Sequence, residues 1–312
     1  MYLGIDLGGT KIEVVVLAAN EENQPGDILY RTRMKTPAMD YDATLRAIKE
    51  LIDQADSAFG PFDVVGVGTP GAVSAKTGTM KNCNSTCLNG KYFPDDLERI
   101  TGKQVVQAND ANCFALSEAI DGSAVGDQVV FGVILGTGVG GGIVISGAVL
   151  QGVNRIAGEW GHNPIPISVL PEGEKRVCYC GKVNCVETYL SGPGFAQTYQ
   201  ALVGVQGRRV ESNLTAQDIA RLIHQKDKQA LHALDIYSKQ LAAALSGVIN
   251  LLDPDSIVLG GGMSNIEALY SQVTRWLPEF IFSDSVETKI QPPKYGDSSG
   301  VRGAAWLVRR RV

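Results

Sequence analysis

The feature that most constrains this fold is an order of elements that occurs twice along the chain. Each occurrence has two strand-like runs joined by a glycine turn, then residues at helical spacing, then a strand that ends in glycine. The first occurrence lies at residues 2–6, 12–17, 45–55 and 64–67, and the second at 129–135, 143–145, 231–252 and 256–259. We therefore expect an α/β protein with two related domains, residues 1–115 and 116–297, and a ligand-binding cleft between them.

Composition and charge exclude several classes of protein. Hydrophobic residues make up 44% of the chain and charged residues 20%, which is ordinary for a globular protein. A net charge of −5 argues against a nucleic-acid-binding surface, and the basic cluster at 309–311 is interpreted as a solvated tail. The longest apolar-rich run, 241–252, is too short to cross a bilayer, and no signal peptide is evident. We expect a cytoplasmic protein without a nucleic-acid or membrane partner.

Three glycine turns follow strands at matching points of the two occurrences. They are Gly8-Gly9-Thr10-Lys11, Gly136-Thr137-Gly138 and Gly260-Gly261-Gly262. Glycine lets backbone N–H groups converge on an anion, although tight hairpin turns require glycine too. The matching positions favour phosphate binding. Asp6 ends an apolar strand, where burying a carboxylate costs free energy unless the group has a function. We expect it to hold a hydrated Mg²⁺ ion beside ATP.

A dinucleotide-binding pattern also occurs within the second turn. Residues 136–141 fit G-x-G-x-x-G, and Glu159 lies at a suitable distance for a ribose contact. That pattern requires a helix after the glycines, whereas β-branched residues follow here at 143–145. A dehydrogenase is therefore the weakest alternative, and no P-loop motif is present.

Several motifs together resemble the ROK family (repressors, open reading frames and kinases). These motifs are Asp6–Lys11, Asn109–Asn112, Leu135–Gly142, Gly158–His162 and the segment from Cys178 to Glu187, and the resemblance extends over essentially the whole chain. It implies the two-domain actin-like ATPase fold of sugar kinases, with the last helix, about 298–312, packing back on the first domain. It also implies a homodimer. Residues 82–86, 88–90 and 160–164 are most similar to bacterial fructokinases and mannokinases, with N-acetylglucosamine kinases as near neighbours.

The resemblance assigns roles to polar residues that the residues alone leave open. Asp110 is expected to be the general base, although a carboxylate there could simply cap a helix. Glu159 could otherwise be a surface residue, and Glu187 a first-turn residue favoured by the helix dipole. The residues expected to contact the sugar are Gly71, Asn84, Asn109, Asp110, Glu159, His162 and Glu187.

A zinc site is expected from three cysteines that occur within eight residues. Cys178, Cys180 and Cys185 supply thiolates, and His162 completes a tetrahedral set. A disulfide is the alternative, but a cytoplasmic protein makes it unfavourable. We expect one nitrogen of His162 to bind the metal and the other to face a sugar hydroxyl. The family motif usually has glycine where Asn184 stands, and asparagine tolerates the left-handed conformation such a turn needs.

The remaining cysteines and the substrate complete the expectations. Cys83, Cys87 and Cys113 are interpreted as packing thiols.

The main hypothesis is an ATP-dependent kinase that phosphorylates D-fructose at its 6-hydroxyl. The alternative keeps the mechanism and changes the hexose to N-acetylglucosamine, mannose or glucose. A sugar-responsive repressor is a further alternative, but repressors of this family carry a DNA-binding module ahead of the first strand, and this chain opens on that strand.

Overall fold

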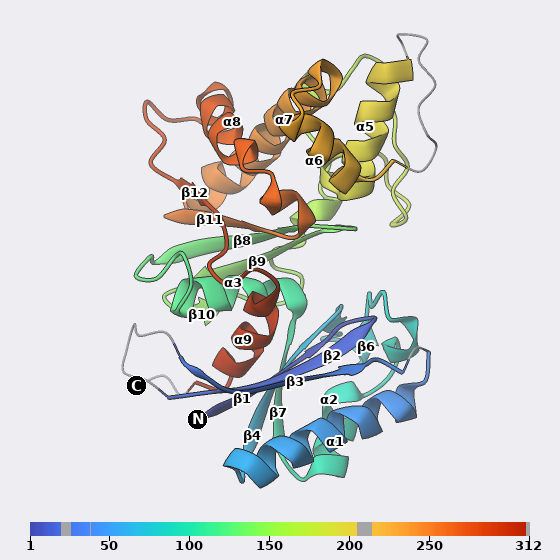
Figure 1. The fold of residues 1–312 in the computed structure, drawn as a ribbon, viewed down its shortest axis with the longest axis vertical. Helices are drawn as coiled ribbons and strands as arrows, with labels where there is room; N and C mark the ends of the chain where they lie inside the picture. The colour runs from blue at the N-terminus through green and yellow to red at the C-terminus, as the bar shows by residue number, and fades with distance from the viewer. Residues whose placement is uncertain (20–25, 38, 205–213, 310–312) are drawn as a thin grey trace. The chain divides into compact units, whose positions relative to one another are not determined.

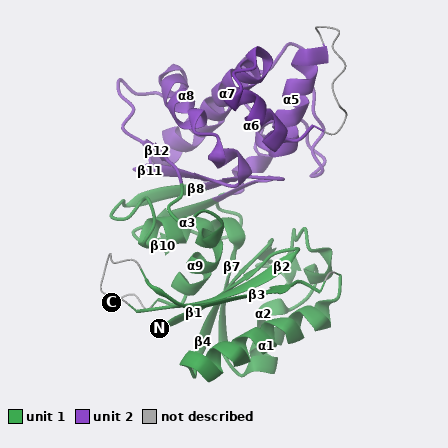
Figure 2. Ribbon diagram, in the orientation of Figure 1, with its two compact units in different colours: residues 1–132, 142–158, 293–312 green, residues 133–141, 159–292 purple. Residues whose placement is uncertain are grey.

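The computed structural model describes residues 1–19, 26–37, 39–204 and 214–309, and they form two compact units. Unit 1 comprises residues 1–132, 142–158 and 293–312, and unit 2 comprises residues 133–141 and 159–292 (Figure 2). Arg310 and Arg311 of the predicted basic tail lie outside the described residues. In the part of the chain that is described, no helix is long and apolar enough to cross a membrane.

Unit 1 is built on a five-stranded sheet of order β3-β2-β1-β4-β7 (Figure 1). The predicted hairpin is confirmed as β1 (Tyr2–Leu7) and β2 (Lys11–Leu17), and β3 (Ile28–Lys35) extends it antiparallel. On the other side of β1, strands β4 (Val64–Thr69) and β7 (Gln104–Asn109) run parallel to it. A short pair, β5 (Ala72–Val73) and β6 (Met80–Lys81), and the turn η1 (Thr86–Leu88) follow β4.

Helices cover both faces of this sheet, and the strands carry apolar residues on one face and glycines on the other. Leu3, Ile5 and other alternate apolar residues pack into one core with α1 (Tyr41–Phe59) and α2 (Phe93–Thr101). The opposite face carries glycine in β1 and β4, because α9 (Ser299–Trp306) lies against it. A Cβ at Gly4 would stand 2.3 Å from the nitrogen of Ala305, and one at Gly66 would stand 1.8 Å from the carbonyl of Ala304. The last helix thus packs on the first sheet.

Helix α3 (Asp110–Ile120) packs along α9 and belongs as a whole to unit 1. Its C-terminal end is held by buried polar contacts: Glu118 accepts a hydrogen bond of 2.6 Å from Ser299 Oγ, and Asp121 pairs with Arg302. The domain boundary expected at residue 115 would divide this helix, whereas the compact unit continues to Gly132. Periodicity alone does not indicate that α3 and α9 share one core.

The second sheet has the order β10-β9-β8-β11-β12. Its strands are β8 (Val129–Leu135), β9 (Val139–Ile145), β10 (Ala148–Val149), β11 (Ser256–Gly260) and β12 (Lys289–Gln291). A strand, not a helix, follows the glycines at 136–138, so the dinucleotide-binding pattern is excluded, as predicted.

The helices of unit 2 pack against one another (Figure 1). They are α4 (Glu187–Leu190), α5 (Gly192–Gly204), α6 (Ala216–His224), α7 (Lys228–Leu252) and α8 (Ala268–Trp276). Single turns of unit 2 occur at η2 (Trp160–His162), η3 (Ile167–Val169), η4 (Gly262–Asn265) and η5 (Leu277–Glu279). The turn η6 (Gly296–Ser298) belongs to unit 1 and leads into α9. The long predicted helix corresponds to α7, whose N-terminus is capped by the side chain of Asp227.

Candidate functional site

Three of the predicted site residues of unit 1 lie at or next to the carboxyl ends of strands β1 and β7. Asp6 lies near the end of β1, Asn109 is the last residue of β7, and Asp110 begins α3. Because β1, β4 and β7 run parallel, these ends meet at one edge of the sheet, where ligands of open α/β sheets commonly bind. The expected base and the expected magnesium ligand are therefore brought together.

Asp6 and Asp110 influence each other electrostatically. Burial raises the pKa of Asp6 to about 7, the charge of Asp110 adds to this rise, and Lys11 opposes it. Asp110 is exposed at the start of α3, where its Oδ1 accepts a 2.8 Å hydrogen bond from the backbone N–H of Ala111. Two carboxylates that disfavour each other's charge form a setting that a divalent cation would stabilise, so these residues fit Mg²⁺.

Replacing Asp6 with asparagine should stabilise the magnesium-free protein in a pH-dependent way. The raised pKa means that wild-type protein loses stability as pH rises from about 4 to about 7, because the folded state holds the proton more tightly. The amide of asparagine carries no such penalty. The melting temperature of Asp6→Asn minus that of wild type should therefore grow over this pH range and level off above pH 7. Thermal melts without magnesium or chelator measure it, and a pH-independent difference would contradict the assignment.

The glycine turn between β1 and β2 is fixed by Thr36, a residue that no sequence motif singles out. Its Oγ1 donates to the Gly8 carbonyl at 2.7 Å, and its backbone N–H donates to the Thr10 carbonyl at 3.1 Å. Gly9 and Thr10 stay exposed. Lys11 Nζ lies 3.2 Å from Glu13 Oε2. The Glu13 side chain is buried and also pairs with Arg31 and Arg33. The turn is therefore rigid at its base and open at its tip.

Two further residues expected at the sugar are linked in unit 1. Gly71 has a φ of +71°, and a Cβ there would stand 2.3 Å from the Lys81 carbonyl, so no other residue fits without strain. Asn109 Nδ2 donates to the Gly71 carbonyl at 3.3 Å. Asn84 is exposed on the loop between β6 and η1, which Asn89 holds through two hydrogen bonds to the backbone of Cys83.

Unit 2 contains a cavity of about 850 Å³, a volume in the range of small-molecule sites. Two of the predicted phosphate turns line it, through Gly136 and Thr137 after β8 and Gly262 after β11. The remaining walls come from α5, η4, α6 and the two residues before α6, with apolar groups such as Pro193, Ala196 and Met263 beside polar ones. Glycine turns beside a half-apolar cavity suit a nucleotide, which has phosphates and a flat base.

The other glycines of these turns have backbone roles. Gly261 has a φ of +79°, and a Cβ there would stand 2.5 Å from the Leu135 carbonyl. At Gly138 a Cβ would stand 2.6 Å from Glu187 Oε2, and the same oxygen accepts a 2.9 Å hydrogen bond from the backbone of Val139. Glu187 is thus attached to the start of β9.

The same strand positions His162. Trp160 Nε1 donates to the Gly140 carbonyl at 3.0 Å, and Gly161 packs so closely that a Cβ would stand 2.3 Å from the Val139 carbonyl. Glu159 is exposed and immediately precedes this turn. The start of β9 therefore holds both the turn that carries Glu159 and His162 and, through Val139, the carboxylate of Glu187.

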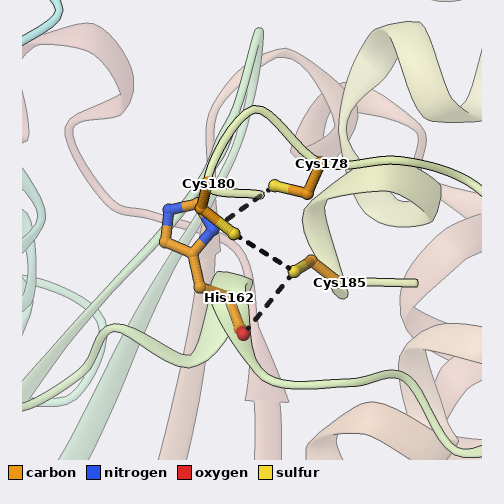
Figure 3. A group of neighbouring side chains, drawn as sticks. All are labelled: His162, Cys178, Cys180 and Cys185. Carbon is orange, nitrogen blue, oxygen red and sulfur yellow. Dashed lines mark hydrogen bonds between the residues drawn. The ribbon is translucent and has the colours of Figure 1, made fainter. Parts of the chain in front are cut away.

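The predicted metal ligands converge in unit 2 (Figure 3). His162 Nδ1 lies 3.6 Å from Cys178 Sγ, and Cys180 Sγ lies 3.6 Å from Cys185 Sγ. All four ligand atoms lie within 4.8 Å of one another. Tetrahedral zinc with Zn–S bonds of about 2.3 Å separates its ligand atoms by about 3.5–3.8 Å, so the donor set and the spacing both fit Zn²⁺.

Asn184 shows how the loop around these ligands turns without the usual glycine. It adopts a φ of +59°, the left-handed conformation that we expected asparagine to tolerate. Its Oδ1 accepts hydrogen bonds from Arg176 N at 2.7 Å and Tyr189 Oη at 3.0 Å. The Arg176 guanidinium in turn donates to the carbonyl of Thr188 at 2.9 Å, close to Glu187 in α4. The substitution is therefore accommodated and adds contacts that a glycine could not make.

The second nitrogen of His162 does not lie open toward a ligand. Its Nε2 lies 3.0 Å from the hydroxyl of Tyr179, a residue that stands between two of the cysteines and that sequence reasoning missed. The other cysteines are as expected: Cys83 and Cys113 are buried, and Cys87 is partly buried.

Comparison with known proteins places this geometry in a family. Residues 2–311 match the ROK family. N-acetyl-D-glucosamine kinase from Photobacterium profundum is 40% identical over 311 residues, covering 98% of this chain and 99% of that protein. ROK hexokinase from Thermus thermophilus has a TM-score of 0.82 at 27% identity, covering 98% of this chain and 97% of its own. A ROK family glucokinase from Streptomyces griseus, in complex with glucose and AMPPNP, has a TM-score of 0.74 at 27% identity, with 98% of each chain covered.

The architecture is the actin-like ATPase fold of the sugar kinases. The chain belongs to the ROK family.

Proposed function

We propose that this protein transfers the γ-phosphoryl group of ATP to the 6-hydroxyl of N-acetyl-D-glucosamine. The observation that carries the proposal is its 40% identity, over 98% of this chain, to a relative named N-acetyl-D-glucosamine kinase. Fructose, the hexose expected first from the sequence, has no support among these relatives. N-acetylglucosamine, one of the alternative hexoses expected from the sequence, is better supported.

The nucleotide has a matching site in unit 2. The 850 Å³ cavity offers Gly136, Thr137 and Gly262 beside apolar walls, and the solved glucokinase relative was crystallised with AMPPNP. Backbone N–H groups at glycine turns are suited to hold phosphate oxygens. The turn Gly8–Lys11 in unit 1 would offer phosphate donors of the same kind.

Chemistry is assigned to the acidic edge of unit 1. Asp110 would accept the proton of the sugar 6-hydroxyl as its oxygen attacks the γ-phosphorus and ADP departs. The Ala111 N–H donates both to Asp110 Oδ1 and to Asn109 Oδ1 at the start of α3. Asp6 would hold Mg²⁺ through water, and the ion would supply charge neutralisation for the phosphates.

The residues proposed to recognise the sugar are polar groups of the motifs described above. Asn109, Asn84 and the backbone at Gly71 belong to unit 1, and Glu159, His162 and Glu187 belong to unit 2. Zinc held by His162, Cys178, Cys180 and Cys185 would be structural, because all four ligands come from protein and no position remains for water.

Product analysis tests the reaction type. Incubation with Mg-ATP and N-acetylglucosamine should yield ADP and a sugar phosphate in equal amounts, and phosphorus and proton NMR should place the phosphate on carbon 6. A phosphate on the anomeric carbon, or the absence of any sugar phosphate, would refute the proposed reaction.

A further inference from the structure

Tyr179 is positioned against the candidate sugar site without belonging to any motif. It lies between the zinc ligands Cys178 and Cys180, and its side chain is 83% exposed. Its hydroxyl stands 3.0 Å from His162 Nε2, and its ring meets the imidazole edge-on, with centroids 5.2 Å apart and planes at 83°. The hydroxyl of this exposed tyrosine thus pairs with His162, one of the residues proposed to bind the sugar.

The phenol oxygen also lies near the other sugar-binding candidates of unit 2. The carboxylates of Glu187 and Glu159 are both close enough to act electrostatically on the phenol of Tyr179. His162 lies within hydrogen-bond distance of its hydroxyl. These three residues are the ones proposed to contact hydroxyls of the hexose.

His162 can serve only one partner at Nε2. Its Nδ1 faces the cysteine thiols, so a metal bound there leaves the neutral ring with a single N–H, on Nε2. With the proton on Nε2, the Tyr179 oxygen, 3.0 Å away, is positioned to accept that N–H. A sugar hydroxyl that takes the same N–H must first displace the phenol.

We propose that the Tyr179 hydroxyl stands in for a hexose hydroxyl and competes with the sugar for His162. The inference rests on the proposed function, since it assumes that a hexose contacts His162. Little holds the phenol in place besides this hydrogen bond and the ring contact, because most of the side chain is exposed. Rotation of an exposed side chain is fast, so Tyr179 would tune sugar affinity rather than block entry.

Tyr179→Phe isolates the hydroxyl, because phenylalanine keeps the ring contact with His162. Dissociation constants for N-acetylglucosamine, measured calorimetrically without nucleotide, should fall about two- to tenfold, the range that one lost competing hydrogen bond allows. Zinc content should stay at one ion per chain. Tyr92→Phe is the matched control, since Tyr92 is 52% exposed and belongs to unit 1, and it should leave the sugar affinity unchanged.

The other results each overturn the inference in a recognisable way. Weaker sugar binding with zinc retained would mean that the phenol contacts the sugar directly. Loss of zinc would mean that Tyr179 serves only to orient the metal ligand. Unchanged affinity with zinc retained would mean that the hydroxyl does not compete. If the wild-type protein bound no hexose at all in the same calorimetric titration, the proposed function would fail as well.

Discussion

Asp110→Asn should lower kcat by at least about 10²–10⁴-fold, the contribution typical of a positioned general base. Asparagine has the same shape, and its side-chain oxygen can still accept the N–H of Ala111, so the start of α3 should persist. An amide cannot take up the proton of the sugar hydroxyl. Steady-state kinetics with saturating sugar and Mg-ATP measure the loss, and calorimetry should show that nucleotide binding changes little.

Asp95→Asn is the control for this experiment. Asp95 is also a carboxylate in the first turn of a unit 1 helix, α2, but it is exposed and has no proposed part in binding or catalysis. Its replacement should leave kcat within about twofold of wild type, as surface substitutions usually do. Near-normal turnover in Asp110→Asn would remove Asp110 from the mechanism.

Cys180→Ser should cost the protein its zinc, and with it stability and sugar affinity. Cys180 is exposed, so serine creates no buried cavity, and without a metal the change should be nearly neutral. With a structural zinc ion, losing one of four ligands couples to folding. We expect substoichiometric zinc by elemental analysis and a melting temperature lower by more than about 5 °C.

The functional consequence of Cys180→Ser should be selective. The cluster ties His162 to the segment that leads into Glu187, so the sugar KM should rise. The KM for ATP should change less, because the cavity of unit 2 is lined by other segments. Cys87→Ser, a partly buried cysteine of unit 1, is the control and should retain one zinc per chain. A zinc-free wild type, or a Cys180→Ser protein with unchanged melting and sugar affinity, would exclude the metal site.

Local patterns in the sequence predicted much of the fold and the convergence of three cysteines with His162. The hairpin β1–β2 and helix α7 follow from periodicity that neighbouring residues carry by themselves. The three cysteines and His162 could be singled out because a zinc site requires four thiolate or imidazole ligands. Asn184 was understood from its own backbone preference, and its positive φ agrees with that reasoning.

Features that depend on distant contacts could not be predicted. Thr36 fixes a glycine turn that lies 28 residues earlier, and nothing near Thr36 in the sequence marks it. Tyr179 stands among motif residues, but its hydrogen bond to His162 depends on how two loops meet. The hexose was inferred from a few polar residues that related kinases share, and small differences in pocket shape decide among sugars.

The most direct test of the account is the specificity constant of wild-type protein for different hexoses. An ADP-release assay with Mg-ATP would compare N-acetylglucosamine, glucose, mannose and fructose under the same conditions. We predict that kcat/KM is highest for N-acetylglucosamine, by about tenfold or more, as expected when a site pairs with a polar substituent. A higher kcat/KM for fructose or another plain hexose, or no ADP release with any of the four, would contradict it.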